Sequence, residues 1–545
     1  MKKYIFVVGG VISGLGKGIT SASIGRLLID YGYKVTNIKM DAYVNVDAGT
    51  MNPTEHGEVF VTDDGLETDQ DIGNYERFLN TTLLKENYAT TGQIYQSLIQ
   101  KERDLYFKGK CVEVVPHVPL EIISRINKAI EKNKSEIVIV EIGGTIGEYQ
   151  NILFIEAARM LKYKNPKDVL VTLVSYFPIP KTLGEMKTKP TQYASRTLNE
   201  TGIQADLLIC RGEQIIDKPR MDRLALLCNM SSEKDIMNAP DVDNIYKIPE
   251  LLEKQKIVQR IVEKLNLPKR NKKESKWKKM VEKIKSKKNK IKIGIVGKYF
   301  TTGDFVLADS YVSVIEAIKH ASLANNLETE FHWVNADKFG KDPKQVKILS
   351  EFDGVVVPQG WGSRGSEGKI NAIKYLRENK IPYLGLCYGM QMAVIEFARN
   401  VLGLKNANSE EINPETAYPV IHIMPGQKEY LKKHQYGGTI RLGAYPCKIK
   451  KNTLLFDIYK SDAVSERHRH RYEFNDKYKK QMEEKGLVIS GTSPDNKLVE
   501  AIEISKEKHP FFLGVQFHPE YKSRPLDPHP IFVEFIKVSA KKNLQ

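Results

Sequence analysis

Twice along this chain of 545 residues, a run of apolar residues ends directly in glycine, as a buried strand does where it turns into a helix. The first run covers residues 4–9 and the second covers residues 291–297. Each is followed by further short apolar runs that alternate with stretches of helical spacing. This alternation is typical of parallel sheets covered by helices. We therefore expect an α/β fold with two doubly wound, mainly parallel-sheet domains.

The expected strands of both halves are short apolar runs bounded by helical segments. In the first half they are residues 35–40, 112–115, 137–142, 169–174 and 207–209, and in the second half they are residues 354–357 and 383–386. No internal repeat is found. The two halves share an architecture but no motifs.

Basic residues are concentrated between the two halves. Residues 268–290 contain twelve Lys or Arg and two Glu, so this segment carries +10 of the net charge of +16. We interpret it as a solvated linker and expect no nucleic-acid partner. Trp277, Met280, Val281 and Ile284 are spaced as on one face of a helix, which predicts a short helix that docks on a domain. The expected domains are residues 1–267 and 291–545.

Composition also bears on the compartment. No run of about 18 uncharged apolar residues is present, so we expect no membrane span and no membrane partner. The five cysteines are scattered and form no Cys-x-x-Cys pair. That pattern argues against a disulfide framework or a zinc site and indicates a reducing cytoplasm.

The turn after the first strand combines glycines with a lysine. Residues 9–20 have the sequence GGVISGLGKGIT. Backbone N–H groups in such a turn can converge on phosphate oxygens, and Lys17 can bridge phosphates. The motif is not a strict Walker A, since Gly10 to Gly16 is one residue too long and Gly18 follows the lysine where Ser or Thr is usual. An ordinary strand–helix turn is the alternative, which the preceding strand and the lysine disfavour.

Phosphoryl transfer also needs a metal held by carboxylates, and two candidates are present. Residues 67–71 form an acidic cluster, which we expect in a loop. Glu141 ends an apolar run and is followed by two glycines, at the end of a strand where α/β sheets bind ligands. Residues 187–192 (KTKPTQ) add two cations and two hydroxyls, although a charged surface loop is equally consistent with them.

The second half carries a nucleophile pattern. Cys387 lies in Gly-Leu-Cys-Tyr-Gly between a strand and a helix, the nucleophile-elbow spacing with Cys in place of Ser. His518 and Glu520 supply a base and an orienting acid, because positions two apart face the same side of an extended segment. Gly360, after another strand end, could donate its N–H to an oxyanion. A buried structural cysteine is the alternative, which the flanking glycines disfavour.

These motifs resemble those of a known family. Residues 9–18, 56–71 and 187–192 are similar to signatures of CTP synthases, and the likeness extends over nearly the whole chain. The order Cys387, His518, Glu520 resembles that of the class I glutamine amidotransferases. The resemblance implies a P-loop-like synthetase domain joined to a class I glutamine amidotransferase domain. Its reaction would be the ATP-dependent amination of UTP to CTP through a 4-phosphorylated UTP, with ammonia from glutamine, as the final step of de novo CTP synthesis.

The resemblance also implies roles for residues at matching positions. For ATP they are Ser13, Gly14, Leu15, Gly16, Lys17, Gly18, Lys39 and Asp71, and for Mg²⁺ they are Asp71 and Glu141. For UTP or CTP they are Ser13, Glu148, Lys187, Lys189, Gln192 and Arg223. For glutamine and its oxyanion they are Gly360, Gln391, Glu411 and Arg471. Arg441, in the lid-like residues 437–443, would serve activation by GTP.

At three places the chain departs from the family pattern. Arg223 replaces a usual Lys, Glu148-Tyr149-Gln150 replaces a common Asp-Ile-Glu, and Gln359 replaces a glycine. These departures bear on nucleotide contacts, on feedback by CTP and on the turn that aims Gly360. By resemblance we also expect a homotetramer, with filaments possible.

Two other functions fit parts of the sequence. Cobyrinic acid amidases share both domain types but act on carboxylates, and residues 56–71 and 187–192 argue against them. An ATP-driven switch with an inactive C-terminal binding domain is the other. The intact set of Cys387, His518 and Glu520 argues against that switch.

Overall fold

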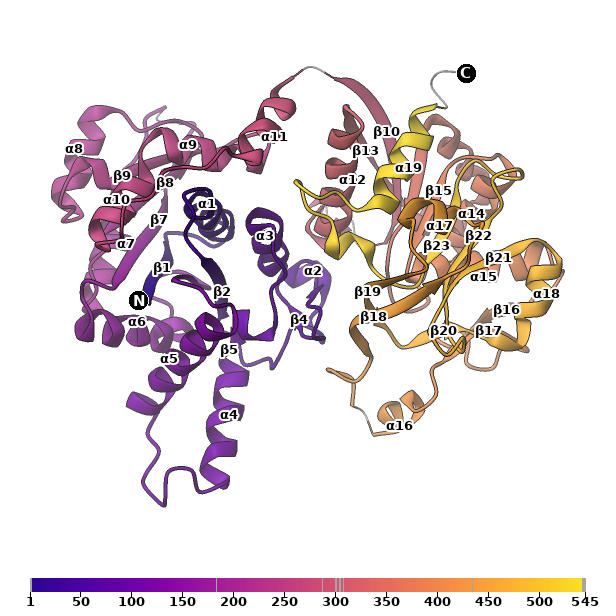
Figure 1. The fold of residues 1–545 in the computed structure, drawn as a ribbon, viewed down its shortest axis with the longest axis horizontal. Coiled ribbons are helices and arrows are strands. Elements are labelled where there is room, and N and C mark those ends of the chain that lie inside the picture. The colour runs from indigo at the N-terminus through magenta and orange to yellow at the C-terminus, as the bar shows by residue number, and fades with distance from the viewer. Residues whose placement is uncertain are drawn as a thin grey trace. The chain divides into compact units, whose positions relative to one another are not determined.

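The protein is described from a computed structural model, which covers residues 2–541 except 183, 287, 299–300, 303–304, 307 and 434. The chain divides into two compact units. Unit 1 consists of Met1–Asp47 and Asp71–Glu282, and unit 2 consists of Ala48–Gln70 and Lys283–Gln545. The segment 48–70 therefore packs with the second unit, although it lies within the first half of the sequence (Figure 1).

Unit 1 is built on a seven-stranded sheet in the order β5-β2-β6-β1-β7-β8-β9, in which every pairing is parallel. The strands are β1 (Lys3–Gly10), β2 (Val35–Asp41), β5 (Tyr88–Thr90), β6 (Ile137–Ile142), β7 (Val169–Tyr176), β8 (Leu207–Gly212) and β9 (Ile236–Pro240). All residues of β1 and β6 are buried, as expected for strands covered on both faces.

Helices cover both faces of this sheet. They are α1 (Lys17–Asp30), α3 (Gln70–Leu79), α4 (Thr91–Arg103), α5 (Val114–Lys132), α6 (Ile152–Lys164), α7 (Lys189–Glu200), α8 (Lys218–Leu227), α9 (Ile248–Lys254), α10 (Ile257–Lys264) and α11 (Lys276–Lys285). Ile5 and Val7 of β1 pack in the core formed with α1, α9 and α10. Phe6 and Val8 face the opposite core, formed with α4, α5 and α6. Because side chains alternate along a strand, one strand serves both cores.

One predicted strand of this unit is wrong. Residues 112–115 are not a strand: α5 begins at Val114, and Val114 and Val115 are exposed. The run is only four residues long, contains Glu113 and is followed by Pro116, which has no N–H for a sheet ladder. A short apolar run next to proline is therefore weak evidence for a buried strand.

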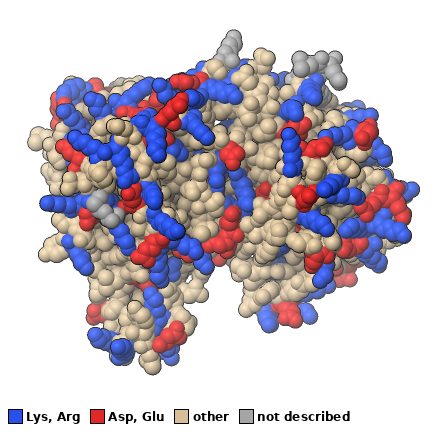
Figure 2. All heavy atoms as spheres, viewed as in Figure 1, with Lys and Arg blue, Asp and Glu red and all other residues tan. Residues whose placement is uncertain are grey.

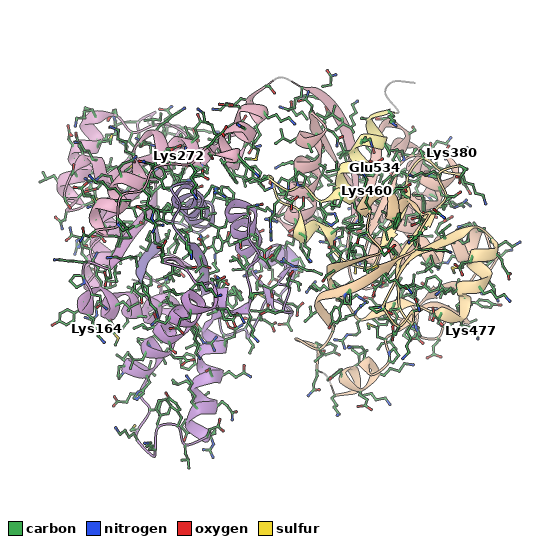
Figure 3. The ribbon with its side chains drawn as sticks, in the orientation of Figure 1. Lys164, Lys272, Lys380, Lys460, Lys477 and Glu534 are labelled. Carbon is green, nitrogen blue, oxygen red and sulfur yellow. The ribbon has the colours of Figure 1, made fainter. Side chains whose placement is uncertain are left out.

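The predicted helix in the basic segment is confirmed as α11, and it docks on unit 1. Trp277 is buried and donates its indole N–H to the Tyr246 carbonyl oxygen at 3.0 Å. The residues before it are also held by hydrogen bonds. Arg270 pairs with Glu136, and Lys272 (Figure 3) contacts both carboxylate oxygens of Glu253 at 2.6 Å. On the visible face, basic side chains are interspersed with acidic ones rather than gathered in one patch (Figure 2).

Unit 2 contains a nine-stranded sheet in the order β13-β10-β14-β15-β23-β22-β21-β18-β19. The pairings from β13 to β23 are parallel and those from β23 to β19 are antiparallel, a half that the apolar runs did not predict. The strands of this sheet are β10 (Asn289–Gly297), β13 (Leu327–Asn335), β14 (Gly354–Val357), β15 (Tyr383–Leu386), β18 (Arg441–Ile449), β19 (Ala463–His470), β21 (Leu487–Thr492), β22 (Val499–Ile504) and β23 (Phe512–Val515). Smaller sheets contain β3 (Phe60–Val61), β4 (Glu67–Thr68), β11 (Thr301–Thr302), β12 (Phe305–Val306), β16 (Ala407–Ser409), β17 (Tyr418–Ile423) and β20 (Tyr472–Phe474).

The helices of unit 2 include those that cover both faces of its large sheet. They are α2 (Pro53–His56), α12 (Val312–Ala324), α13 (Ala336–Lys341), α14 (Ser366–Glu378), α15 (Tyr388–Asn400), α16 (Gln427–Lys432), α17 (Leu454–Tyr459), α18 (Lys479–Glu484) and α19 (Pro530–Lys541). α12, α17 and α19 share one core with the sheet, and α14 and α15 share the other. Among the helices described, none is long and apolar enough to span a membrane.

Candidate functional site

In unit 1, three charged side chains meet at the carboxyl ends of neighbouring parallel strands. Lys39 in β2 donates to Asp71 Oδ2 at 2.5 Å and to Glu141 Oε1 at 3.0 Å. Asp71 lies in the first turn of α3, and Glu141 lies near the end of β6. The predicted loop cluster 67–71 is therefore not a loop, since Glu67 belongs to β4 and Asp71 to α3. Only Asp71 of its acidic residues contacts Lys39 in the hydrogen bonds described.

The glycine after Lys17 has a steric reason. A Cβ atom on Gly18 would lie 2.0 Å from Asp71 Oδ1, far inside van der Waals contact. The Ser or Thr of a strict Walker A motif would thus displace the carboxylate that Lys39 holds. Gly18, in place of the usual Ser or Thr, therefore leaves room for the Asp71 carboxylate of α3 beside this turn.

The lysine of the turn is buried beside the same cluster. Lys17 Nζ donates to the Gly144 carbonyl oxygen at 2.8 Å, in the loop after β6. Burial lowers the pKa of Lys17, while the nearby Glu141 carboxylate opposes that shift. Both lysines therefore lie at one end of the parallel sheet, with amines fixed on oxygen atoms of the protein.

The two carboxylates that contact Lys39, those of Asp71 and Glu141, suit a magnesium site. Burial raises the pKa of Glu141, whereas contact with Lys39 outweighs burial and keeps the pKa of Asp71 below its ordinary value. Mg²⁺ is commonly bound by one or two carboxylates together with substrate phosphates. Asp71 and Glu141 fit that description. The described residues contain no cluster of three or more His, Cys, Asp or Glu side chains arranged to hold a metal.

The residues predicted to contact UTP or CTP are not joined to one another by hydrogen bonds in the described structure. Ser13, Lys189 and Arg223 are exposed. Lys187 pairs with Glu185 at 2.6 Å, and Glu148 accepts hydrogen bonds from Thr145. Gln192 bonds to Thr188 in the first turn of α7. α7 packs on β1 and β7, with Ala194 against Gly10, so its first turn lies beside the phosphate-loop candidate.

Sequence reasoning did not identify Arg211, at the end of β8. Its guanidinium donates to the carbonyl oxygens of Leu15, Ala239 and Pro240. The first of these contacts links the end of β8 to the glycine turn. A charged residue near the end of a buried strand was the available signal for Arg211, as it was for Glu141.

In unit 2, Cys387 lies at a strained turn between β15 and α15. Its φ of 49° and ψ of −99° are unusual for a residue with a side chain. The turn also depends on its two glycines. A Cβ atom on Gly385 would lie 2.1 Å from Tyr383 Oη, and one on Gly389 would lie 2.0 Å from the Val357 carbonyl oxygen. The local geometry is that of a nucleophile elbow.

His518 and Glu520 lie beside this cysteine. His518 Nδ1 is 2.7 Å from Glu520 Oε1, and both side chains are buried. The segment is a 3₁₀ turn (Pro519–Lys522) rather than the extended chain that was predicted, yet it brings the two groups together. Although burial lowers it, the Glu520 carboxylate and the Cys387 thiol raise the pKa of His518 to about 10. The imidazole is therefore held in its charged form near neutral pH.

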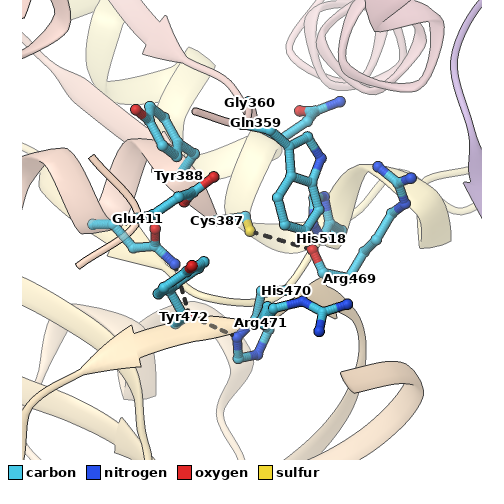
Figure 4. Close-up of a pocket in the computed structure, with 12 residues that line it drawn as sticks. Gln359, Gly360, Cys387, Tyr388, Glu411, Arg469, His470, Arg471, Tyr472 and His518 are labelled. Atoms are coloured by element: carbon cyan, nitrogen blue, oxygen red, sulfur yellow. Dashed lines mark hydrogen bonds between the residues drawn. The ribbon is translucent and has the colours of Figure 1, made fainter. Parts of the chain in front are cut away.

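A pocket opens over the thiol (Figure 4). Its lining includes Cys387, Gln391, Glu411, Arg471 and His518. Glu411 accepts the Gly362 N–H at 2.7 Å, and one terminal nitrogen of Arg471 is buried without a hydrogen-bond partner. A carboxylate and a guanidinium on opposite sides of one pocket complement the ammonium and carboxylate of a free amino acid.

Other contacts orient the thiol itself. Gln516 Nε2 lies 3.4 Å from Cys387 Sγ, and Gln391 bonds to Gln516 and to the Tyr472 carbonyl oxygen. The Cys387 thiol also donates weakly to the Arg469 carbonyl oxygen at 3.7 Å. Neither Gln516 nor Arg469 was singled out from the sequence, because nothing local marks them.

The segment 48–70 reaches the surroundings of this pocket. Glu67 accepts from Arg469 at 2.8 Å, and Asp63 pairs with Arg467. Tyr521 donates to the Val59 carbonyl oxygen and its ring stacks on His518 at 5.0 Å. The signature segment 56–71 is thus divided, because Asp71 belongs to the charged cluster of unit 1 and the residues before it pack near the thiol.

Arg441 begins β18 and is 8% exposed. It donates to Glu500 Oε1 at 2.7 Å, and His468 shares that carboxylate at 2.9 Å. The Arg441–Glu500 pair is buried inside unit 2. The resemblance had implied that Arg441 belongs to a lid.

The chain was compared with known proteins. Residues 3–267 match the family described as CTP synthase N-terminus, and residues 306–538 match glutamine amidotransferase class-I. Similar proteins are the CTP synthases of Caldanaerobacter subterraneus subsp. tengcongensis (49% identical over 98% of both chains) and Clostridium acetobutylicum (48% identical over 98% of both chains). A third, from Carboxydothermus hydrogenoformans, is 48% identical over 100% of this chain and 99% of its own.

One solved structure is also similar. It is the glutaminase domain of Trypanosoma brucei CTPS with bound acivicin, 38% identical, with a TM-score of 0.42. The alignment covers 46% of this chain and 94% of that chain.

Proposed function

This chain belongs to the CTP synthase family and makes CTP from UTP with ATP and the amide nitrogen of glutamine, and we propose how its residues divide that chemistry. The observation that carries the proposal is the pair of separate sites. One unit has a buried thiol beside a charged imidazole, and the other has lysines and carboxylates at a glycine turn. Nitrogen release and phosphoryl transfer therefore have one site each.

In the thiol site, Cys387 is the nucleophile. The Cys387 thiol gives its proton to His518 and its sulfur attacks the side-chain amide carbon of glutamine, so that the carbonyl oxygen takes up the negative charge. His518 then passes that proton to the departing nitrogen as the C–N bond breaks. Ammonia leaves, and water then hydrolyses the thioester to glutamate. Glu520 holds the imidazole through Nδ1, as its contact of 2.7 Å supports.

Recognition of glutamine follows from the charges of the pocket. Glu411 suits the ammonium group and Arg471 suits the carboxylate, while Gln391 packs beside them. Gly360 and the residue after the nucleophile, Tyr388, are proposed to donate backbone N–H groups to the oxyanion, as in other nucleophile elbows.

In the other site, the O4 atom of UTP is phosphorylated and becomes a leaving group. Ammonia then forms a bond to C4 as the bond to the phosphate oxygen breaks. Lys17 and Lys39 are proposed to move from protein oxygens onto the phosphates, with Ser13, Gly14, Leu15, Gly16 and Gly18 forming the cradle. Asp71 and Glu141 would hold Mg²⁺, which neutralises charge on the phosphates of ATP when it is bound.

The remaining contacts and partners are also proposals. Glu148, Lys187, Lys189, Gln192 and Arg223 would bind UTP, or CTP as a feedback inhibitor. Arg441 would serve activation by GTP, acting through its pair with Glu500 because its side chain is buried. We propose a homotetramer that can extend into filaments.

We further propose that residues 1–267 act as the synthetase domain, 268–290 as the linker and 291–545 as the amidotransferase domain. The family matches at 3–267 and 306–538 support this division. The five cysteines are free, which supports a reducing compartment, the cytoplasm.

The test is CTP formation, followed by ultraviolet absorbance with UTP, ATP and Mg²⁺, using glutamine or ammonia as nitrogen source. Wild type should use both, and Cys387→Ala should use ammonia alone. CTP from glutamine in the mutant would remove Cys387 from the chemistry. No CTP from either source in wild type would contradict the function itself.

A further inference from the structure

Two lysines that no motif identified lie buried under the loop that lines the thiol pocket. Lys298 follows the last residue of β10 and is 2% exposed, and Lys369 lies in α14 and is 0% exposed. Lysine is almost never fully buried unless its charge is compensated. Here both amines lie over the ring of Tyr388, the residue after the nucleophile, at 4.7 and 5.2 Å from its centroid.

Both amines bond to carbonyl oxygens of one loop, residues 358–362. Lys369 Nζ donates to the Pro358 carbonyl oxygen at 2.7 Å. Lys298 Nζ donates to the carbonyl oxygens of Trp361 and, at 3.1 Å, Gly362. Three carbonyl groups of a five-residue loop are thereby turned toward buried positive charge.

Because of peptide geometry, contacts that fix a carbonyl group also fix the direction of the next residue's N–H group. In a trans peptide, the C=O of one residue and the N–H of the next point in opposite directions. The Trp361 carbonyl points to Lys298, and the Gly362 N–H accordingly points to Glu411 in the pocket at 2.7 Å. The held carbonyls of Pro358 and Trp361 lie on either side of Gln359 and Gly360, so the short stretch between them is fixed at both ends.

Gly360 itself rests on the two lysines. A Cβ atom at this position would lie 2.9 Å from Lys298 Cε and 3.6 Å from Lys369 Nζ. The amines are therefore directly beneath the residue whose N–H we assign to the oxyanion. Positive charge this close to a developing negative charge in a buried site favours the charged transition state.

Burial acts against the charge of both amines, and neighbouring negative charge acts in its favour. Burial lowers the pKa of Lys298 to about 8, and Glu411 opposes the shift. Burial and the charge of Lys298 lower the pKa of Lys369 well below its usual range, and Cys387 opposes that shift. Negative charge that appears on the sulfur or on the amide oxygen would therefore raise the pKa of both amines and favour their charged form.

We propose that Lys298 and Lys369 are positioning residues for the glutamine reaction, which hold the loop 358–362 so that its N–H groups face the substrate and which place positive charge beneath the oxyanion. This inference rests on the proposed thiol chemistry. It adds two residues that act through Gly360, Gly362 and Tyr388 without contacting the reacting atoms.

The test uses Lys298→Met and Lys369→Met in the full-length chain, with Lys374→Met on the same helix as the matched control. Lys374 is partly buried and has no hydrogen bond or ion pair described. For each variant, kcat and KM for glutamine are measured in CTP formation, along with the ammonia-dependent rate. Alkylation of Cys387 by iodoacetamide near neutral pH reports on the charge around the thiol.

We expect each lysine variant at the loop to lower kcat for glutamine by about 100-fold, the scale of losing one oxyanion donor, with a smaller change in KM. In these variants the ammonia-dependent rate should stay within about twofold of wild type, and alkylation of Cys387 should slow. Lys374→Met should leave kcat for glutamine, the ammonia-dependent rate and the alkylation rate unchanged. Lys298→Arg keeps the charge and the donors and should recover part of the loss.

Three outcomes would overturn the proposal. One is an unchanged kcat for glutamine in both methionine variants, and another is a change confined to KM. The third is an equal loss of the ammonia-dependent rate, which would assign the lysines to the fold. If instead wild type failed to use glutamine at all, the proposed function would fail rather than this inference.

Discussion

The two sites of this chain both lie at the carboxyl ends of parallel strands, but their charged groups are paired in different ways. In the thiol site, His518 and Glu520 contact each other at 2.7 Å and the imidazole is already charged by its neighbours. In the phosphate site, Lys17 rests on a backbone carbonyl and Lys39 on two carboxylates. The charged groups of the thiol site are already in contact with their functional partners in the protein. In the phosphate site, the lysines are bound to protein oxygens and would have to move onto the phosphates of a nucleotide.

This difference follows from the chemistry each site must perform. A covalent nucleophile needs its base and orienting acid assembled before the substrate arrives. Phosphoryl transfer depends mainly on positioning and on neutralising the charge of the phosphates, so the ligand itself completes the site. Exposed residues such as Ser13, Lys189 and Arg223 are consistent with a site that closes around its substrate.

The largest effect that would separate the two sites is expected from Lys39→Met. Without this cation, the carboxylates of Asp71 and Glu141 face each other and the transferring phosphate loses a positive partner. We expect CTP formation to fall by about 10³-fold with either nitrogen source, the lower end for losing a cation at a phosphoryl site. Glutamate release from glutamine, measured separately, should persist. Loss of glutamate release as well would show that the two sites are not separable in this way.

A paired substitution of glycines sharpens the same comparison. Gly18→Ser would place its Cβ against Asp71, and Gly385→Ala would place its Cβ against Tyr383 Oη. Displacements of about 1 Å at a reacting site can cost about 100-fold in rate. We expect Gly18→Ser to lose that much with both nitrogen sources and Gly385→Ala to lose it with glutamine alone. Steady-state rates with glutamine and with ammonia distinguish these patterns, and an identical pattern for both variants would argue against them.

The sequence predicted the parallel strands because their burial is local. β14 and β15 were predicted at their observed bounds, since each is a continuous apolar run covered on both faces. The antiparallel half was missed because β19 has the sequence AVSERHRH, in which the buried residues are charged or polar. Arg467 pairs with Asp63 and His468 pairs with Glu500, and these partners compensate the burial of the two side chains. No periodicity in the sequence reveals such partners.

The same distinction holds for the sites. The elbow around Cys387 was predictable because its glycines, strand and helix are adjacent in sequence. Lys298 and Arg211 were not, because each donates to backbone carbonyls that lie far along the chain. Lys369 was not, because its carbonyl partner, Pro358, belongs to a loop outside its own helix. A cation at the end of a buried strand is the pattern that could have marked Lys298 and Arg211. Lys369, within a helix, carries no such mark.

The smallest predicted effect concerns stability and tests whether the thiol site is assembled before the substrate binds. The pKa of His518 is raised from 6.5 to about 10, so its charged form stabilises the fold fully below pH 6.5. That contribution is lost as the pH rises through about 10, because the folded state then releases the proton. In Glu520→Gln the carboxylate no longer raises the pKa of His518, so the loss should still begin near pH 6.5 but end at a lower pH, with a smaller total amplitude.

The measurement is the free energy of unfolding in urea at several pH values between 6 and 10.5 for wild type and Glu520→Gln. Subtracting the two curves removes the titration of Lys298 and other groups that both proteins share. One proton contributes at most about 1.4 kcal/mol per pH unit to the slope, which sets the size of the difference. Parallel curves would mean that Glu520 does not hold the imidazolium in the free protein. In that case the thiol site, like the phosphate site, would be completed only by its substrate.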